Sequence, residues 1–205
     1  MKFLLGTKVK MAQVWGEDGK VVPVTVIAVS PNVVTQVKTA DKDGYSAIQV
    51  GFGERNPKNI NKPLRGHIKT LGNFAGLKEF RTDGSLAVAV GDKIDAGAFK
   101  PGDMVTVSAT SKGKGFQGGV KRHGFHGGSR THGQKHSERE PGGIGGGGRA
   151  GGRVAKGLRM AGRMGGERVT IKGLKVIQAD AATATILIKG AVPGPRGTFV
   201  EIREN

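Results

Sequence analysis

Short runs of β-branched residues, separated by turn-forming residues, dominate the first part of the chain. Residues 21–29 (VVPVTVIAV) and 32–38 (NVVTQVK) are two such runs, and the turn signal SPN at 30–32 separates them. A third candidate covers residues 45–52. β-branched and aromatic side chains pack well on a pleated surface, whereas proline and asparagine favour turns. The pattern therefore predicts three strands joined by short connections.

Similar runs recur after residue 100. They cover residues 104–109 (MVTVSA), 168–177 (RVTIKGLKVI), 185–189 (TILIK) and 198–202. Six or more short strands with turns between them are typical of a barrel or a sandwich. We therefore expect a mainly β fold in which the strands from the two ends of the chain join in one domain.

Residues 53–100 interrupt this strand pattern. Four apolar residues recur there at helical spacing: Leu64, Ile68, Leu71 and Phe74. The sequence NKP at 61–63 could open a helix, because proline is accepted in a first turn. Gly66 and Gly72 weaken the pattern. We expect one short helix that packs on the barrel.

Residues 111–168 differ in composition from the rest of the chain. They hold 20 of the 37 glycines, four of the five histidines, and 13 Lys and Arg against three Glu. With so few apolar residues, burial cannot offset the entropy lost on ordering. We expect a long extended Gly/Arg/Lys-rich insertion at 111–166 that orders only against a partner. It would divide a β-barrel domain into a first part at 1–110 and a last part at 167–205.

The charge of the whole chain indicates the kind of partner. There are 33 Lys and Arg against 16 Asp and Glu, a net charge of +17. Such a charge is best explained by a polyanion, either nucleic acid or an anionic membrane. No apolar run approaches the roughly 20 residues that span a bilayer, and we see no secretory signal. We expect a cytoplasmic protein with no membrane partner and no small-molecule substrate.

Residues 113–118 (GKGFQG) match the G-x-G-x-x-G pattern of dinucleotide-binding sites, and Glu138 follows at about the expected distance. That fingerprint requires a helix after the glycines and a second strand before the acidic residue. Residues 119–137 show neither pattern. We interpret the motif as a flexible basic turn whose glycines let the backbone approach phosphates.

Four histidines in the same segment have spacings that would permit a metal site: His123, His126, His132 and His136. A metal-binding or nucleotide-dependent enzyme using this cluster is the main alternative function, and a DNA-binding protein is a second. The neighbouring Lys and Arg side chains oppose a metal cation, and histidine also stacks on bases and donates to phosphates. A glycine-rich ribbon supplies no water-excluding pocket for catalysis. We expect no metal, no other cofactor and no catalytic residue. The absence of cysteine excludes disulfides and thiolate ligands.

Two aromatic residues, Phe116 and Phe125, lie among these cations. Aromatic rings can stack on unpaired bases. They can equally pack the base of the insertion onto the barrel, and the sequence leaves both interpretations open.

Several long motifs are spread over nearly the whole chain. They are PVTVIAV (23–29), VTQVK (34–38), TSKGKGFQGGVKRHGF (110–125), THGQKHSEREPGGIG (131–145), KGLRMAGRMGGERVT (156–170) and LIKGAVPGPRG (187–197). In this order, they resemble the bacterial form of the universal large-subunit ribosomal protein family "L-three".

The resemblance implies a translation-protein type β-barrel with an extension running through rRNA towards the peptidyl transferase centre. It implies a non-enzymatic structural constituent of the large ribosomal subunit, located in cytoplasmic ribosomes. Its partners would be large-subunit (23S) rRNA, especially near the 3′ end, and neighbouring large-subunit proteins. A role in nucleating subunit assembly is also implied.

The chain departs from the family at the tip of the insertion. The family usually carries polar residues there, including a glutamine that is methylated in some bacteria. Residues 145–152 read GGGGRAGG and contain no glutamine, so this methylation is not expected. Arg149 is the only charged residue of the stretch. It would either anchor the tip to RNA or lie in solvent within a glycine linker.

The cations and histidines of the insertion are the expected RNA-binding site. Most should contact phosphate and sugar, which fixes position without reading sequence. The candidates are Lys112, Lys114, Lys121, Arg122, His123, His126, Arg130, His132, Lys135, His136, Arg139, Arg149, Arg153, Lys156, Arg159 and Arg163.

Overall fold

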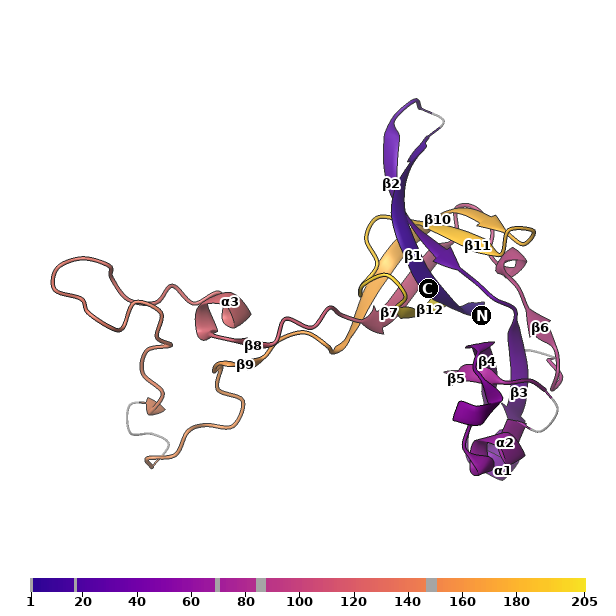
Figure 1. The fold of residues 1–205 in the computed structure, drawn as a ribbon, viewed down its shortest axis with the longest axis horizontal. Helices are drawn as coiled ribbons and strands as arrows, with labels where there is room; N and C mark the ends of the chain where they lie inside the picture. The colour runs from indigo at the N-terminus through magenta and orange to yellow at the C-terminus, as the bar shows by residue number, and fades with distance from the viewer. Residues whose placement is uncertain (1, 17, 69–70, 84–87, 147–150) are drawn as a thin grey trace. The chain divides into compact units, whose positions relative to one another are not determined.

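The chain folds into two compact units. The computed structural model describes residues 2–16, 18–68, 71–83, 88–146 and 151–205. One unit comprises Met1–Thr110 and Arg168–Asn205, and the other comprises Ser111–Glu167, called the basic insertion below (Figure 1). No helix in the described residues is long and apolar enough to cross a membrane.

Six strands of the first unit close into a barrel in the order β1-β12-β7-β10-β11-β2. Their bounds are β1 Phe3–Trp15, β2 Val21–Ala28, β7 Met104–Thr110, β10 Arg168–Asp180, β11 Thr185–Lys189 and β12 Phe199–Glu204. Every neighbouring pair is antiparallel. Three strands precede the basic insertion and three follow it, so both ends of the chain build one barrel. The expected fold class, mainly β with a barrel, is confirmed.

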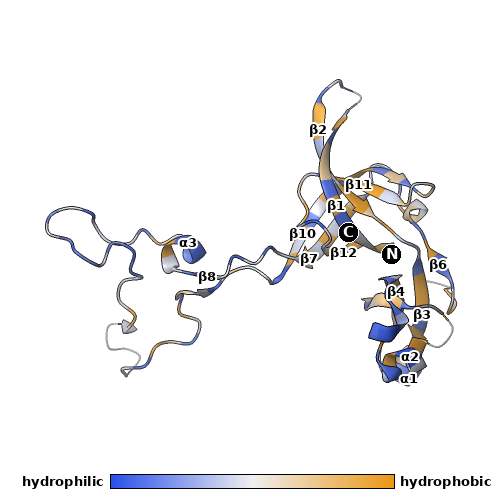
Figure 2. Ribbon diagram, viewed as in Figure 1, coloured by the Kyte–Doolittle hydropathy of each residue, from blue (hydrophilic) through white to orange (hydrophobic). Residues whose placement is uncertain are grey.

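The barrel is filled by alternate residues of its strands, because successive side chains of a strand point to opposite faces. Leu4, Ile27, Val107, Ile186 and Ile202 are among the fully buried side chains of this core. Figure 2 shows hydrophobic residues along these strands. Alternating burial thus explains why the β-branched runs of the sequence become barrel strands.

A second sheet in the first unit has the order β5-β4-β3-β6. Its strands are β3 Asn32–Lys38, β4 Ala47–Glu54, β5 Phe74–Arg81 and β6 Lys93–Ile94. Phe3 and Leu5 of β1 belong to its core, whereas Leu4 belongs to the barrel core. The ring of Phe3 stacks on that of Phe80 with centroids 4.4 Å apart. Strand β1 therefore contributes its two faces to two different cores.

The helix expected between residues 61 and 74 is shorter than its apolar spacing predicts. Helix α2 covers Lys62–Ile68, and Phe74 begins β5 instead. Phe74 pairs with Glu54 of β4 and its ring covers Gly51, so sheet pairing overrides the helical spacing. His67 Nε2 hydrogen-bonds Gln49 Oε1 of β4 at 2.7 Å. The expectation that this helix packs on the barrel is wrong, because it lies beside the four-stranded sheet (Figure 1).

The remaining helical elements are short. They are α1 Ala40–Asp43, α3 Gly119–His123, and the 3-10 turns η1 Pro57–Asn59 and η2 Ala96–Ala98. Helix α3 belongs to the basic insertion, and the others belong to the first unit.

Candidate nucleic-acid interface

The two ends of the basic insertion pair with each other. Strands β8 (Phe116–Gln117) and β9 (Gly162–Arg163) form a two-stranded antiparallel sheet. Met164 extends it, because Lys114 N donates to Met164 O and Met164 N donates to Gly115 O, each at 2.9 Å. The outgoing segment, which contains β8, and the returning segment, which contains β9, therefore form one antiparallel ribbon.

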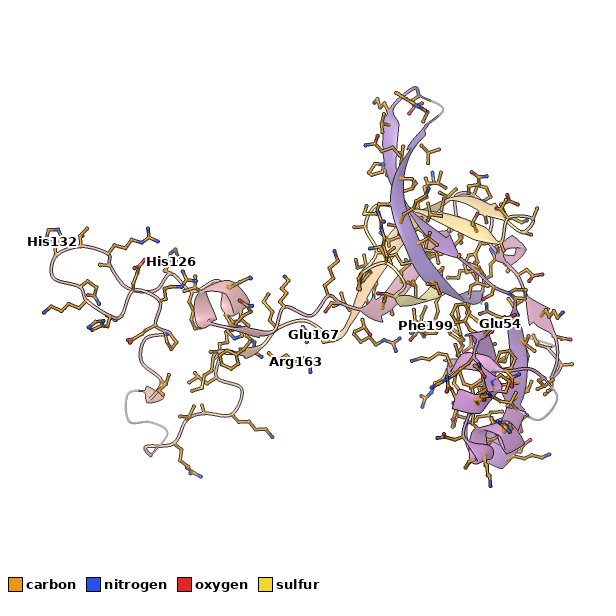
Figure 3. The ribbon with its side chains drawn as sticks, in the orientation of Figure 1. Glu54, His126, His132, Arg163, Glu167 and Phe199 are labelled. Carbon is orange, nitrogen blue, oxygen red and sulfur yellow. The ribbon has the colours of Figure 1, made fainter. Side chains whose placement is uncertain are left out.

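This ribbon is closely packed at Gly165. Its φ of +70° lies in the left-handed region, and a Cβ there would collide with the carbonyl oxygen of Lys112. Only glycine meets both conditions without strain. The side chains of Lys112, Lys114 and Arg163 are exposed around this close approach, and Figure 3 labels Arg163. The ribbon thus presents three of the predicted contact residues to solvent.

Helix α3 is fastened to the returning segment by two side chains. The carbonyl oxygen of Met160 accepts a hydrogen bond from Arg122 Nη1 at 2.7 Å, and His123 Nε2 lies 3.0 Å from the same oxygen. A Cβ on Gly162 would lie 2.7 Å from Arg122 Nη1. Both Arg122 and His123 are half-buried. Two residues predicted to contact RNA are therefore engaged within the protein.

The two phenylalanines of the basic insertion have different surroundings. Phe125 is half-buried, and a Cβ on Gly119 would lie 2.9 Å from its ring. The ring centroids of Phe125 and His123 are 5.6 Å apart. Phe116 is 77% exposed. Phe125 therefore packs under helix α3, and Phe116 presents its ring to solvent.

A loop beyond helix α3 is closed at its base by Gly127, Gly128 and Glu138. Gly128 N donates to Glu138 O at 3.0 Å. Gly127 has φ +78°, and a Cβ there would collide with the same oxygen. Arg130 Nε forms a salt bridge with Glu138 Oε1 at 2.6 Å. This closure presents an exposed turn whose basic side chains are His132, Lys135 and His136.

The four histidines do not form one cluster in the described structure. His123 contacts the Met160 carbonyl, whereas Figure 3 shows His126 near the base of the loop and His132 on its far turn. Among the residues that the structure describes, no three His, Cys, Asp or Glu side chains are grouped so that they could hold a metal ion.

The other predicted contact residues of the basic insertion are exposed. They are Lys121, His126, Arg139, Arg153, Lys156 and Arg159. Arg149, together with the two interpretations of the tip, lies outside the described residues.

Some carboxylates of the first unit are paired with its own cations. Glu201 of β12 bridges Arg168 at 2.5 Å and Lys78 at 2.9 Å. Lys38 contacts Glu79 at 2.8 Å, and this hydrogen bond lowers the pKa of the Glu79 carboxyl and raises the pKa of Lys38. In the basic insertion cations far outnumber carboxylates, so most of its charge is available to an external anion.

Comparison with known proteins gives a consistent result. A family model described as "Ribosomal protein L3" matches residues 86–185. A protein named "Large ribosomal subunit protein uL3" from Parafrankia sp. (strain EAN1pec) is 52% identical over 202 residues, covering 98% of this chain and 85% of the relative. The protein of that name from Streptomyces coelicolor is 51% identical over 205 residues, which cover 99% of this chain and 95% of the relative. The protein of that name from Clavibacter michiganensis is 50% identical over 202 residues, which cover 98% of this chain and 93% of the relative. With such identity along nearly its whole length, the chain belongs to the ribosomal protein L3 (uL3) family.

Proposed function

We propose that this protein is a non-enzymatic structural constituent of the large ribosomal subunit that binds rRNA through its basic insertion. The observation that carries the proposal is the exposure of most insertion cations on a glycine-rich ribbon and loop. Lys and Arg contacts to phosphate supply most of the sequence-independent affinity for nucleic acid. Membership of the uL3 family supports the large subunit as the place of binding.

The basic insertion suits a crowded RNA environment for a second reason. Glycine has no side chain to exclude an RNA strand, so a glycine-rich segment can pass through narrow gaps. The same segment holds few apolar side chains with which to build a core. RNA packing around it would supply the contacts that its own residues lack.

Finer aspects of the proposal come from the resemblance to the family. The insertion would run through large-subunit (23S) rRNA towards the peptidyl transferase centre. The protein would bind near the 3′ end of that RNA and help nucleate subunit assembly, beside neighbouring large-subunit proteins in cytoplasmic ribosomes.

The test is salt-dependent binding of the full chain to a large-subunit rRNA transcript. Replacing Lys112, Lys114 and Arg163 by glutamine should reduce the slope of log affinity against log salt by about 2–3 units, since each lost phosphate contact removes about 0.7–0.9. A matched control neutralises three exposed lysines of the first unit: Lys42, Lys58 and Lys62. Equal slopes for the two triple variants would refute the insertion as the main RNA-binding surface.

The same binding assay addresses the two alternative functions. Competition by duplex DNA equal to that by RNA would favour a DNA-binding protein, because the 2′-hydroxyl lets a protein distinguish the two polymers. Stoichiometric zinc, copper or nickel in the purified protein would favour a metal-dependent function of the histidines.

A further inference from the structure

The basic insertion contains a hollow of about 470 Å³ between the base of its loop and the segment that follows. Its lining side chains are Phe125, His126, Ser137, Glu140 and Pro141. Glycine backbone at positions 124, 127, 128 and 142 completes the wall. Pockets for small organic ligands begin at roughly 300 Å³, so the space is large enough for one planar heterocycle.

The chemistry of this hollow differs from that of the surface around it. No lysine or arginine lines it, although cations are abundant in the basic insertion, and the acidic residue Glu140 is one of its lining residues. A carboxylate repels phosphate, so the hollow is unsuited to the RNA backbone. It offers an aromatic face, a hydroxyl and an acidic acceptor, which together suit the edge and face of a base.

Glu140 is available for such a contact. Glu138, two residues earlier, forms a salt bridge with Arg130. Among the described residues, none forms a salt bridge with the Glu140 carboxylate, although its backbone N–H donates to Ser137 O at 3.3 Å. That backbone bond joins Glu140 to Ser137, a second lining residue of the hollow.

Phe125 supplies a rigid aromatic wall. The ring packs against Gly119 of α3. It lines both this hollow and an adjacent one of about 300 Å³. The adjacent hollow is walled by Ile144, Leu158 and Arg159 and contains no carboxylate. Only the first hollow therefore combines a stacking surface with an acidic acceptor.

We propose that this hollow binds one unstacked guanine base of the RNA, stacked on Phe125 and hydrogen-bonded to Glu140. Guanine presents two adjacent donors, N1–H and the N2 amino group, which match the two oxygens of a carboxylate. Uracil presents one donor between two carbonyl oxygens, and cytosine and adenine each place an amino group beside an acceptor nitrogen. The inference rests on the proposed function, because it needs RNA around the basic insertion.

The test uses the full chain bound to a large-subunit rRNA transcript. A dicarbonyl reagent that modifies the N1 and N2 positions of guanine would be applied with and without protein. We expect one guanine to be protected by the wild-type protein and exposed again in Glu140→Gln and in Phe125→Leu. Each substitution should weaken binding about tenfold, as expected when one base loses its stacking or its bidentate contact. The salt slope should not change, because no phosphate contact is lost.

Two residues of the same insertion provide matched controls. Glu167→Gln makes the same charge change as Glu140→Gln, and Phe116→Leu makes the same size change as Phe125→Leu, but neither residue lines the hollow. Removing a negative charge should by itself strengthen RNA binding slightly. The base contact therefore predicts that Glu140→Gln weakens RNA binding, whereas Glu167→Gln strengthens it slightly.

The outcomes separate the two levels of the proposal. If Glu140→Gln binds RNA as tightly as Glu167→Gln with unchanged guanine protection, the base pocket is refuted while the proposed function stands. Protection of a different base at this position would overturn the assignment to guanine. If the wild-type protein shows no salt-dependent RNA binding, the proposed function itself fails. Glu140→Gln keeps the test decisive even if Phe125→Leu disturbs helix α3.

Discussion

The side-chain amide of Asn32 hydrogen-bonds both backbone groups of Leu5. Asn32 Oδ1 accepts from Leu5 N at 2.8 Å, and Asn32 Nδ2 donates to Leu5 O at 3.0 Å and to Ser30 O at 2.8 Å. Asn32 is fully buried. Leu5 pairs with Glu201 of β12 on one side, but β1 pairs with β2 only from Thr7 onward. The Asn32 amide therefore takes the place of β2 beside Leu5.

Replacing Asn32 by alanine should destabilise the first unit by about 2–4 kcal/mol. The substitution leaves the buried N–H and C=O of Leu5 without partners, and each unsatisfied group costs about 1–3 kcal/mol. Chemical denaturation would measure the free energy of unfolding. Asn59→Ala, at an exposed position, is the control and should change it by less than about 0.5 kcal/mol. Similar values for both variants would contradict the structural role of Asn32.

Gly165→Ala should open the ribbon of the basic insertion without unfolding the barrel. The added Cβ would collide with the Lys112 carbonyl, at a backbone conformation that alanine adopts only with strain. Ser111 N donates to Glu167 O at 2.8 Å and Lys114 N donates to Met164 O at 2.9 Å. Hydrogen exchange at these two amides should accelerate, whereas exchange in the barrel strands should not. Gly113→Ala is the control, since a Cβ there meets no atom within 4 Å. Equal exchange in both variants would disprove the close packing at Gly165.

Lys121 and Arg122 are adjacent cations with different expected roles. Lys121 is exposed, whereas Arg122 donates to the Met160 carbonyl. Lys121→Ala should reduce the salt slope of RNA binding by about one unit and leave helix α3 intact. Arg122→Ala should accelerate hydrogen exchange in α3, because it removes a bond holding the helix. If Arg122→Ala changed the salt slope of RNA binding but not hydrogen exchange in α3, the structural role of Arg122 would be contradicted.

The Glu79 carboxylate should make the stability of the first unit depend on acid pH. Hydrogen bonds from Lys38, then from Tyr45, lower its pKa below the ordinary 4.5 in the folded state. A lowered folded pKa means that this stabilisation is fully present above pH 4.5 and is lost as pH falls through the folded value. Urea denaturation should therefore show wild type more stable than Glu79→Gln at about pH 7, and the difference should shrink by about pH 3. A difference that persisted unchanged at acid pH would contradict this linkage.

Strands rich in β-branched residues could be predicted closely from the sequence. The runs at Asn32–Lys38 and Thr185–Lys189 coincide with β3 and β11, because local propensity and tertiary burial agree there. Strand β1 was not predicted. It contains Gly6 and Lys8, and its register shifts between Lys8 and Lys10, so its alternation is weak. Its strand conformation comes from pairing with β2, the next strand along the chain, and with β12, which lies far away in the sequence.

The candidate site was predictable in composition but not in arrangement. Charge and glycine content are local properties, so the sequence indicates a basic insertion directly. Which cations turn inward depends on contacts between distant residues. Arg122 reaches a carbonyl 38 positions away, and no spacing rule anticipates that bond. The hollow beside Phe125 likewise depends on residues from both sides of the loop, so the sequence alone does not indicate Glu140 as a binding residue.

The pairing of the first and last strands has a consequence for how the protein is made. Phe3 of β1 lies opposite Arg203 of β12, so the barrel cannot close until almost the whole chain has been synthesised. Such non-local pairing folds slowly, and unpaired strand edges invite association until it is complete. The basic insertion emerges before β10, β11 and β12 are available. During its synthesis the protein therefore has an interval in which the cations of the insertion can reach RNA while the barrel is still open.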